Sequence, residues 1–290
     1  MTGNVFDPNY GNPAIPESAA NPGDEIVQPA NAAPLTDVVE LRGIEQVYGQ
    51  GDKAQVVFRN FSLSIPDIPD RGQFCTIMGP SGCGKSTILR YISGLQNPTA
   101  GEILFKGKPR DPQKSVPMVF QQYSSFEWKS VLHNVTLPLE LQGVGRREAE
   151  DQAMEMLKVV GLEAHAGKFA KYPNLSGGQL QRVAIARSLV VHPSILLMDE
   201  PFGALDVKTR REMQDFLRTI FEAQEDMTVI LVTHSESEAV FLSDKVTVLN
   251  ANPAMIVADI PIHLPAVRDD AARIAPEFEH YVAQVRKALS

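Results

Sequence analysis

Cysteine is scarce in this sequence, which contains Cys75 and Cys83 and no other among its 290 residues. Two cysteines cannot form the disulfide framework of a small secreted domain, and neither has nearby cysteine or histidine partners at the spacing of a zinc site. We therefore expect reduced thiols and a cytosolic protein.

Long hydrophobic runs are also missing. The longest apolar runs, such as residues 195–198 and 229–232, fall far short of the ~20 residues that a membrane-spanning helix needs. The start of the sequence shows neither the basic nor the apolar segment of a signal peptide. We expect a chain that does not cross a membrane, so that any membrane association comes through a partner.

Positive charge is in deficit, with 27 Lys and Arg against 35 Asp and Glu. A nucleic-acid-binding domain usually has a basic face, so this balance argues against a nucleic-acid partner and against docking on anionic lipid. What the chain does have is ordinary for a globular protein with a substantial core, at 43% hydrophobic and 21% charged residues.

The pattern along the chain divides it into three parts. Residues 1–36 are rich in Asn, Pro, Ala and Gly, and we predict a disordered or extended N-terminal tail that acts as a passive extension. Short apolar strands then alternate with helical patterns, which predicts an α/β domain with a mostly parallel sheet. Residues 263–290 are predicted to be a C-terminal helical extension, with one amphipathic helix over 271–289.

A glycine-rich segment follows an apolar strand and precedes a helix. It reads Gly79-Pro80-Ser81-Gly82-Cys83-Gly84-Lys85-Ser86-Thr87 and fits the pattern G-x-x-x-x-G-K-S/T. Glycines let backbone N–H groups approach phosphates closely, and the helix start adds partial positive charge. Lys85 can reach the β- and γ-phosphates, and the Ser86 hydroxyl suits Mg²⁺. We predict that these nine residues form a nucleotide site.

Cys83 inside this loop has two interpretations. A helix N-terminus lowers the pKa of a thiol, which would make Cys83 reactive. The interpretation that we favour is that Cys83 fills a variable position of the loop.

Two carboxylates follow the apolar run at 195–198. A buried strand of a parallel sheet delivers them at its carboxyl edge, beside the phosphates. Asp199 is placed to hold Mg²⁺ through water, and Glu200 to act as general base on the attacking water. Such a segment alone is often a strand that runs into a polar loop, and the phosphate loop in the same chain favours the functional interpretation.

A second anion-binding helix start reads Leu175-Ser176-Gly177-Gly178-Gln179. It offers a hydroxyl, free backbone N–H groups and a helix dipole, although an ordinary helix cap would look similar. With the residues that follow it, 181–187, this pentapeptide resembles the signature motif of ABC-type ATPases. In that family the signature of one subunit caps the γ-phosphate held by the phosphate loop of the other. The resemblance therefore implies that Ser176, Gly177, Gly178 and Gln179 bind nucleotide across a pair of subunits.

Four further residues resemble elements of that family. Gln121 resembles the Q-loop glutamine, which contacts Mg²⁺ and water, and Asp206 resembles the D-loop aspartate, which communicates across the dimer. His234 resembles the switch histidine on the γ-phosphate, and Tyr48 the aromatic residue that stacks on adenine. The resemblance implies an ATPase whose catalytic residues are Glu200, His234, Lys85 and Gln121 and whose metal ligands are Ser86, Gln121 and Asp199.

The resemblance covers about residues 37–262 and implies a P-loop NTPase fold. A RecA-like parallel-sheet core would carry an N-terminal antiparallel β-subdomain and a helical subdomain, about 122–174, that presents the signature. ATP and Mg²⁺ are the implied cofactors. The implied partners are a second ATPase subunit, identical or related, and integral membrane permease subunits at the cytoplasmic face of the cell membrane.

The separate single domain and the region of Trp128 resemble the nitrate/sulfonate/taurine/bicarbonate importer group, which also uses a periplasmic or lipid-anchored solute-binding protein. Two residues depart from the family pattern: Leu180 replaces a frequent Gln, and Glu127 replaces a frequent Pro before Trp128. An exporter or another permease stays an alternative. A non-transport ABC ATPase of DNA repair or translation does too, although the interval from Gln121 to Leu175 is too short for a coiled-coil insertion.

Overall fold

The computed structural model describes residues 37–49, 51, 54–68, 71–112, 114–122, 124–223, 226–251, 253–265 and 267–290. These residues belong to one compact unit. The predicted N-terminal tail, residues 1–36, lies outside the described residues.

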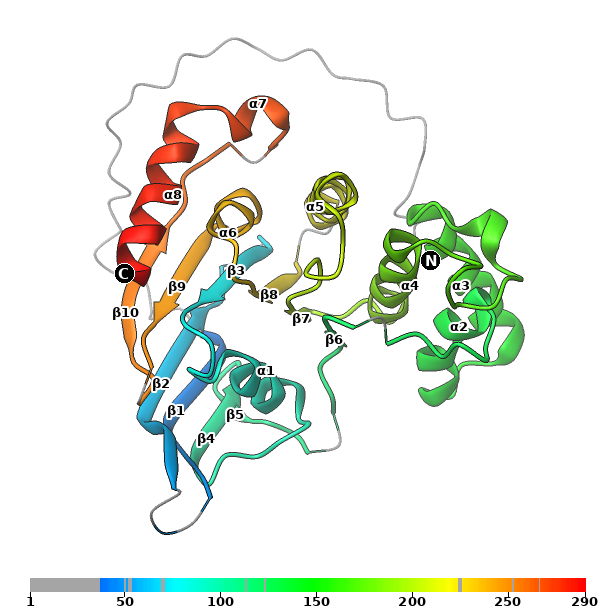
Figure 1. Ribbon diagram of the computed structural model, residues 1–290. Helices are drawn as coiled ribbons and strands as arrows, with labels where there is room; N and C mark the ends of the chain where they lie inside the picture. The colour runs from blue at the N-terminus through cyan, green and yellow to red at the C-terminus, as the bar shows by residue number, and fades with distance from the viewer. Residues whose placement is uncertain are drawn as a thin grey trace. The chain divides into compact units, whose positions relative to one another are not determined.

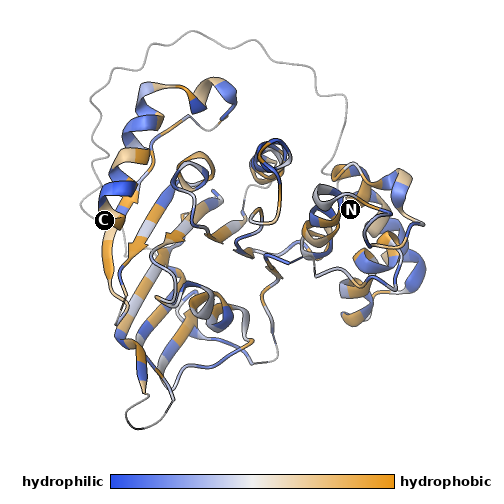
Figure 2. Ribbon diagram, viewed as in Figure 1, coloured by the Kyte–Doolittle hydropathy of each residue, from blue (hydrophilic) through white to orange (hydrophobic). Residues whose placement is uncertain are grey.

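A six-stranded sheet forms the core, in the order β10-β9-β3-β8-β7-β6 (Figure 1). Five strands run parallel to their neighbours, and β10 pairs antiparallel with β9 at one edge. The strands are β3 (Gln73–Met78), β6 (Met118–Val119), β7 (Ile195–Asp199), β8 (Thr228–Val232), β9 (Lys245–Leu249) and β10 (Ile256–Pro261). The central strands β3 and β8 are buried along their whole length, as their near-continuous apolar sequences predict for a sheet covered on both faces (Figure 2).

A second, antiparallel sheet has the order β2-β1-β4-β5. Its strands are β1 (Asp37–Tyr48), β2 (Gln55–Pro66), β4 (Ala100–Phe105) and β5 (Lys108–Pro109). Helix α1 (Lys85–Ser93) shares one hydrophobic cluster with this sheet and with one face of the core sheet. The phosphate loop that opens α1 is therefore fixed by two sheets at once.

The signature helix α4 (Gly177–Leu189) packs with α2 (Val131–Leu141) and α3 (Arg146–Val159), and a 3₁₀ turn, η2 (Glu163–His165), follows α3. Figure 1 shows this helical region beyond the β6 edge of the core sheet. The sequence-based prediction of an α/β P-loop fold with an antiparallel sheet and a helical region is confirmed.

Helices α5 (Val207–Glu222) and α6 (Glu236–Leu242) follow β7 and β8, and the chain ends in α7 (Asp270–Arg273) and α8 (Pro276–Leu289). The prediction of one helix over 271–289 is wrong at its start. Pro276 has no N–H to donate back to the preceding turn, so α7 ends and Pro276 opens a new helix at its N1 position. Among the described residues, no helix is both long and apolar enough to cross a bilayer.

Candidate active site

The loop between β3 and α1 has the backbone of a phosphate cradle. Gly79, Gly82 and Gly84 have φ values of 155°, 81° and 101°, a region that glycine adopts without strain. A Cβ at Gly84 would lie 2.4 Å from Cζ of Phe58, and one at Gly79 would lie 2.6 Å from the carbonyl oxygen of Leu249. The loop is thus pressed against β2 and β9 at its two ends, while its tip at Gly82 faces open space.

Lys85 is the first residue of α1 and is almost fully buried. Its Nζ donates hydrogen bonds to the carbonyl oxygens of Gly79 (2.8 Å) and Pro80 (2.9 Å). These acceptors are neutral, and a phosphate oxygen is a stronger partner for an ammonium group than a carbonyl. The ammonium group is therefore held at the loop, at the positive end of α1, where a phosphate would be bound.

Ser86 and Asp199 bring two oxygens together from different elements. The Ser86 hydroxyl, on α1, donates to Oδ1 of Asp199, the last residue of β7, over 3.0 Å. Burial raises the pKa of Asp199 above its ordinary value, although the Ser86 hydrogen bond opposes the rise. The described residues contain no group of three or more His, Cys, Asp or Glu side chains placed for a metal. Mg²⁺ commonly binds through one or two protein oxygens together with substrate phosphates, and this pair fits that pattern.

Glu200 and His234 meet at the carboxyl ends of the neighbouring strands β7 and β8. Nε2 of His234 lies 2.7 Å from Oε1 of Glu200, and both side chains are partly exposed. Glu200 has φ 47°, an uncommon conformation for a residue with a side chain, and one that clusters at active sites. Its backbone N–H donates to the carbonyl oxygen of Val232 (2.9 Å), which fixes this turn to β8. The sheet register thus places an acid and an imidazole side by side.

Gln121 and Asp206 lie on the loops that border these residues. A Cβ at Gly203 would lie 3.1 Å from Nε2 of Gln121, so the glutamine amide rests against the turn that follows Glu200. Asp206 is the N-cap of α5, and its Oδ1 accepts hydrogen bonds from the N–H groups of Lys208 and Thr209, each at 3.1 Å. Hydrogen bonding by Thr209 lowers the pKa of Asp206.

Sequence reasoning missed Arg210, which holds the loop after Glu200. Its guanidinium group donates to the carbonyl oxygens of Phe202 (3.2 Å) and Leu205 (2.8 Å). No motif marks such a residue, because its acceptors are backbone atoms whose positions only the fold determines.

The signature segment forms a complete capping box at the start of α4. The Ser176 hydroxyl accepts from the N–H of Gln179 (3.3 Å), and Oε1 of Gln179 accepts from the N–H of Ser176 (2.9 Å). A Cβ at Gly178 would lie 2.7 Å from Cγ2 of Thr209, so a glycine is needed where α4 meets α5. The structure does not bring this helix start to the phosphate loop of the same chain, since Figure 1 shows α4 well apart from α1.

Tyr48 and Cys83 complete the predicted set. Tyr48, at the end of β1, is partly exposed, and its hydroxyl accepts a hydrogen bond from Nε2 of Gln96 (2.8 Å). Cys83 is buried, and burial raises the pKa of its thiol. The raised pKa argues against the reactive-thiol interpretation and for a residue that fills the loop.

Together these features define a P-loop nucleotide-binding protein: a parallel sheet, a glycine-rich loop that opens a helix, and an acidic pair at the end of a neighbouring strand.

Comparison with known proteins identifies the family within this class. Residues 58–203 match the family described as ABC transporter. The nitrate import ATP-binding protein NrtD of Synechocystis sp. is 38% identical over 258 residues, which cover 87% of this chain and 94% of that protein.

The taurine import ATP-binding protein TauB of Rhizobium johnstonii is 43% identical over 229 residues, or 77% of this chain and 86% of that protein. Among solved structures, a dimeric bacterial ABC transporter cassette superposes with a TM-score of 0.66 at 32% identity, covering 78% of this chain and all of that one. The chain belongs to the family of ABC transporter ATP-binding subunits. The prediction of an ABC-type ATPase that binds ATP is confirmed.

Proposed function

We propose that this chain powers an importer of small anionic solutes such as nitrate, sulfonates or bicarbonate. The relatives named for nitrate and taurine import support the direction of transport, and the nitrate relative supports a small anionic cargo. We assign the ATPase domain to residues 37–262, with its helical subdomain at about 122–174, and treat 263–290 as an extension.

The observation that carries the ATPase part of the proposal, a nucleotide site shared by a pair of chains, is the separation of two phosphate-binding helix starts within one chain. Lys85 lies buried at the start of α1, whereas Ser176 caps α4 beyond the edge of the core sheet. One chain therefore supplies half of each site, and two chains facing each other supply two complete sites. A dimeric relative of the same fold supports this arrangement.

In this arrangement the residues of the site divide the work of phosphoryl transfer to water. Lys85 and the loop N–H groups bind the β- and γ-phosphates, and Ser176 of the second chain binds the γ-phosphate from the other side. Glu200 takes the proton from the attacking water, and His234 stabilises charge on the γ-phosphate.

Mg²⁺, when bound, neutralises phosphate charge; Ser86, Asp199 and Gln121 would hold it. Asp206 contacts the second chain at the interface between the two facing chains. Tyr48 stacks on the adenine.

Exposed aromatic side chains of the helical region suit the permease partner. Trp128, Phe169 and Tyr172 are 72%, 52% and 78% exposed, and large exposed apolar side chains that gather together mark interaction sites. Beside them is a hollow of ≈ 350 Å³. Its lining residues are Ser125, Glu127, Ala170, Tyr172, Gly177 and Leu180. Both departures from the family pattern, Glu127 and Leu180, line this hollow.

Through that contact the subunit would sit on the cytoplasmic face of the cell membrane, and a periplasmic or lipid-anchored solute-binding protein would join the complex indirectly. Affinity purification from native membranes tests these partners. Co-elution of an integral membrane protein supports the proposal, whereas co-elution with ribosomes or DNA would favour a non-transport ATPase.

Glu200→Gln tests the paired site in the purified chain. The amide cannot accept the proton, so ATP should stay intact and hold two chains together as a dimer, as seen by size-exclusion chromatography with ATP. A variant that hydrolyses ATP at the wild-type rate would refute the role of Glu200. A variant that binds ATP yet stays monomeric would refute the paired site.

A further inference from the structure

The C-terminal segment, residues 263–290, is packed against the elements that carry the active site. Phe278, Val282 and Val285 of α8 are buried in the same hydrophobic cluster as Val240 and Phe241 of α6. Helix α6 begins two residues after His234. This segment lies outside the residues matched by the family, and none of its side chains has a role in the proposed reaction.

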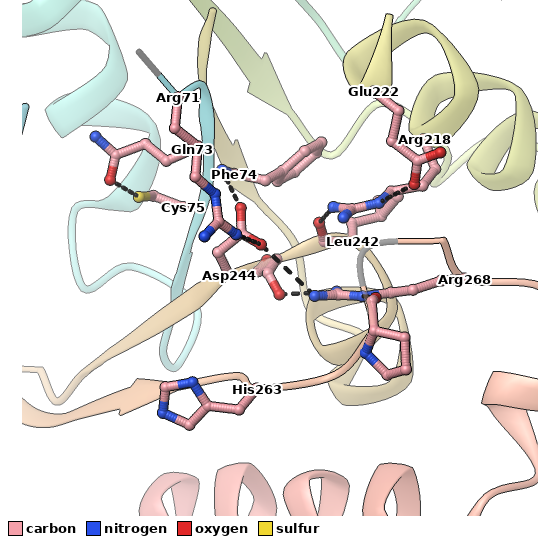
Figure 3. Close-up of polar contacts among 12 residues, drawn as sticks. Arg71, Gln73, Phe74, Cys75, Arg218, Glu222, Leu242, Asp244, His263 and Arg268 are labelled. Atoms are coloured by element: carbon pink, nitrogen blue, oxygen red, sulfur yellow. Dashed lines mark hydrogen bonds and ion pairs between the residues drawn. The ribbon is translucent and has the colours of Figure 1, made fainter. Parts of the chain in front are cut away.

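Arg268 from this segment is bound to the last turn of α6. Its side chain is 1% exposed, and its Nη1 donates to the carbonyl oxygens of Val240 (3.1 Å), Phe241 (2.9 Å) and Ser243 (2.8 Å). Figure 3 shows Asp244 between the guanidinium groups of Arg71 and Arg268. These carbonyls are the free acceptors at the end of a helix, and a buried guanidinium group with several donors satisfies them. The end of α6 is thus fixed by the C-terminal segment.

Arg273, at the end of α7, joins α5 to α6. Its Nη1 donates to Oε1 of Gln214 (3.0 Å), and its Nη2 lies 2.6 Å from Oδ1 of Asp215. Its guanidinium carbon also lies 3.3 Å from the centre of the Phe241 ring. One side chain therefore contacts the helix that follows Asp206 and the helix that follows His234.

Gln214, which accepts from Arg273, also donates a hydrogen bond to Glu238. Its Nε2 donates to Oε2 of Glu238 over 3.1 Å, and both side chains are buried. Arginine can only donate hydrogen bonds and an ionised carboxylate can only accept them. The Gln214 amide is therefore held in one orientation, with its oxygen toward Arg273 and its nitrogen toward Glu238.

Glu238 in turn is bound to the residue before His234. Burial raises the pKa of the Glu238 carboxyl group, and hydrogen bonding by the buried Thr233 side chain opposes the rise. The backbone N–H of Glu238 also donates to Oγ of Ser235 over 3.3 Å. The Thr233 hydroxyl also accepts from the N–H of Ser235 (3.1 Å), so the residues on both sides of His234 are held. A continuous set of side-chain contacts runs from Arg273 through Gln214 and Glu238 to Thr233.

We propose that Arg273 is a positioning residue for ATP hydrolysis, which acts through Gln214, Glu238 and Thr233 to hold His234 in line with Glu200. The inference rests on the proposed role of His234 at the γ-phosphate. Without Arg273, the Gln214 amide and the buried Glu238 carboxylate lose their fixed partner, and the backbone at His234 gains freedom. Hydrolysis slows as a result, whereas ATP binding, which depends on the phosphate loop, does not change.

Arg273→Ala in the full-length chain tests this set of contacts from Arg273 to Thr233, which we call the relay. Phosphate release and fluorescent-nucleotide titration are the readouts. We expect kcat to fall about fivefold, within the range of network substitutions, with an unchanged Kd for ATP. The decisive comparison is the same substitution in a His234→Ala background. There the relay has nothing left to position, so Arg273→Ala should leave the residual rate unchanged.

Two matched variants are expected to keep the wild-type kcat. Asp215→Asn removes the negative charge beside Arg273 and leaves the Gln214 contact, and Lys287→Ala removes an exposed positive charge from the same segment. If Arg273→Ala does not fold, Arg273→Lys takes its place. Lysine keeps the charge but lacks the planar fork that reaches Gln214 and Asp215 together, so kcat should again fall.

Three results would overturn the relay: an unchanged kcat in folded Arg273 variants, a loss of ATP affinity equal to the loss of kcat, or an equal loss of rate with and without His234. A normal rate for His234→Ala alone would instead refute the role of His234 in the proposed function. The two failures are thereby distinguished.

Discussion

Nε2 of His234 and Oε1 of Glu200 lie 2.7 Å apart and hold each other at the carboxyl ends of β8 and β7. Each of these side chains is expected to act at the γ-phosphate. His234 stabilises its charge, and Glu200 takes the proton from the attacking water. Their contact gives both groups a defined orientation before the second chain arrives, which limits the reorganisation that the transition state requires. It also means that a change in either residue alters the position of the other.

Lys85→Ala should weaken ATP binding rather than slow hydrolysis alone. The Lys85 ammonium group lies at the phosphate loop, 2.8 Å from the carbonyl oxygen of Gly79, where it would pair with the β- and γ-phosphates. We expect a loss of affinity of about 100-fold, equivalent to roughly 3 kcal/mol, in a fluorescent-nucleotide titration. Wild-type affinity in a folded Lys85→Ala variant would show that the nucleotide binds elsewhere.

Two inactive variants should restore each other when they are mixed. Lys85→Ala damages the phosphate loop of one chain, and Ser176→Arg blocks the signature of the other. A mixed pair still contains one intact site, which combines Lys85 from one chain with Ser176 from its partner. ATPase activity in the mixture, but in neither variant alone, is the expected result. A mixture as inactive as its components would argue that both residues act within a single chain.

Gly84→Ala should destabilise the fold more than Gly82→Ala. Both glycines have positive φ values, 101° and 81°, so the backbone strain of an added side chain is similar at the two positions. Only at Gly84 would the new Cβ collide with another residue, at 2.4 Å from Cζ of Phe58. We expect the difference in unfolding free energy between the two variants to be about 1–3 kcal/mol, from urea denaturation. Equal losses would mean that β2 moves aside without cost.

Cys75 should make the protein less stable at alkaline pH. Burial raises the pKa of its thiol to about 12, whereas the thiol of the unfolded chain ionises near pH ~8.5. A raised native pKa stabilises the fold fully below the unfolded value, and this contribution is lost as pH rises toward the native value. The unfolding free energy of the wild type should therefore fall relative to Cys75→Ala by about 1.4 kcal/mol per pH unit above pH ~9.

Urea unfolding of both proteins at about pH 8 and about pH 10 measures this difference. A gap between wild type and Cys75→Ala that stays constant with pH would show that the native thiol ionises as freely as the unfolded one.

The sequence by itself determined the elements whose signals are local. The phosphate loop is a contiguous segment whose glycines, lysine and helix start act within nine residues, and the apolar runs around Ile195 and Thr228 predict strands covered on both faces. The motif at Ser176 likewise predicts its own helix cap, because an N-cap is formed by residues three positions apart. These features do not depend on distant parts of the chain.

Only the tertiary structure decided which distant residues meet. The contact between Glu200 and His234 follows from the pairing of β7 with β8, and the contacts of Arg210 follow from where α5 lies against the loop after Glu200. The docking of Arg268 on α6 and of Arg273 on α5 and α6 likewise has no motif. Their acceptors are backbone carbonyls and single side chains far away in sequence, and these come within hydrogen-bonding distance only once the sheet order and helix packing are fixed.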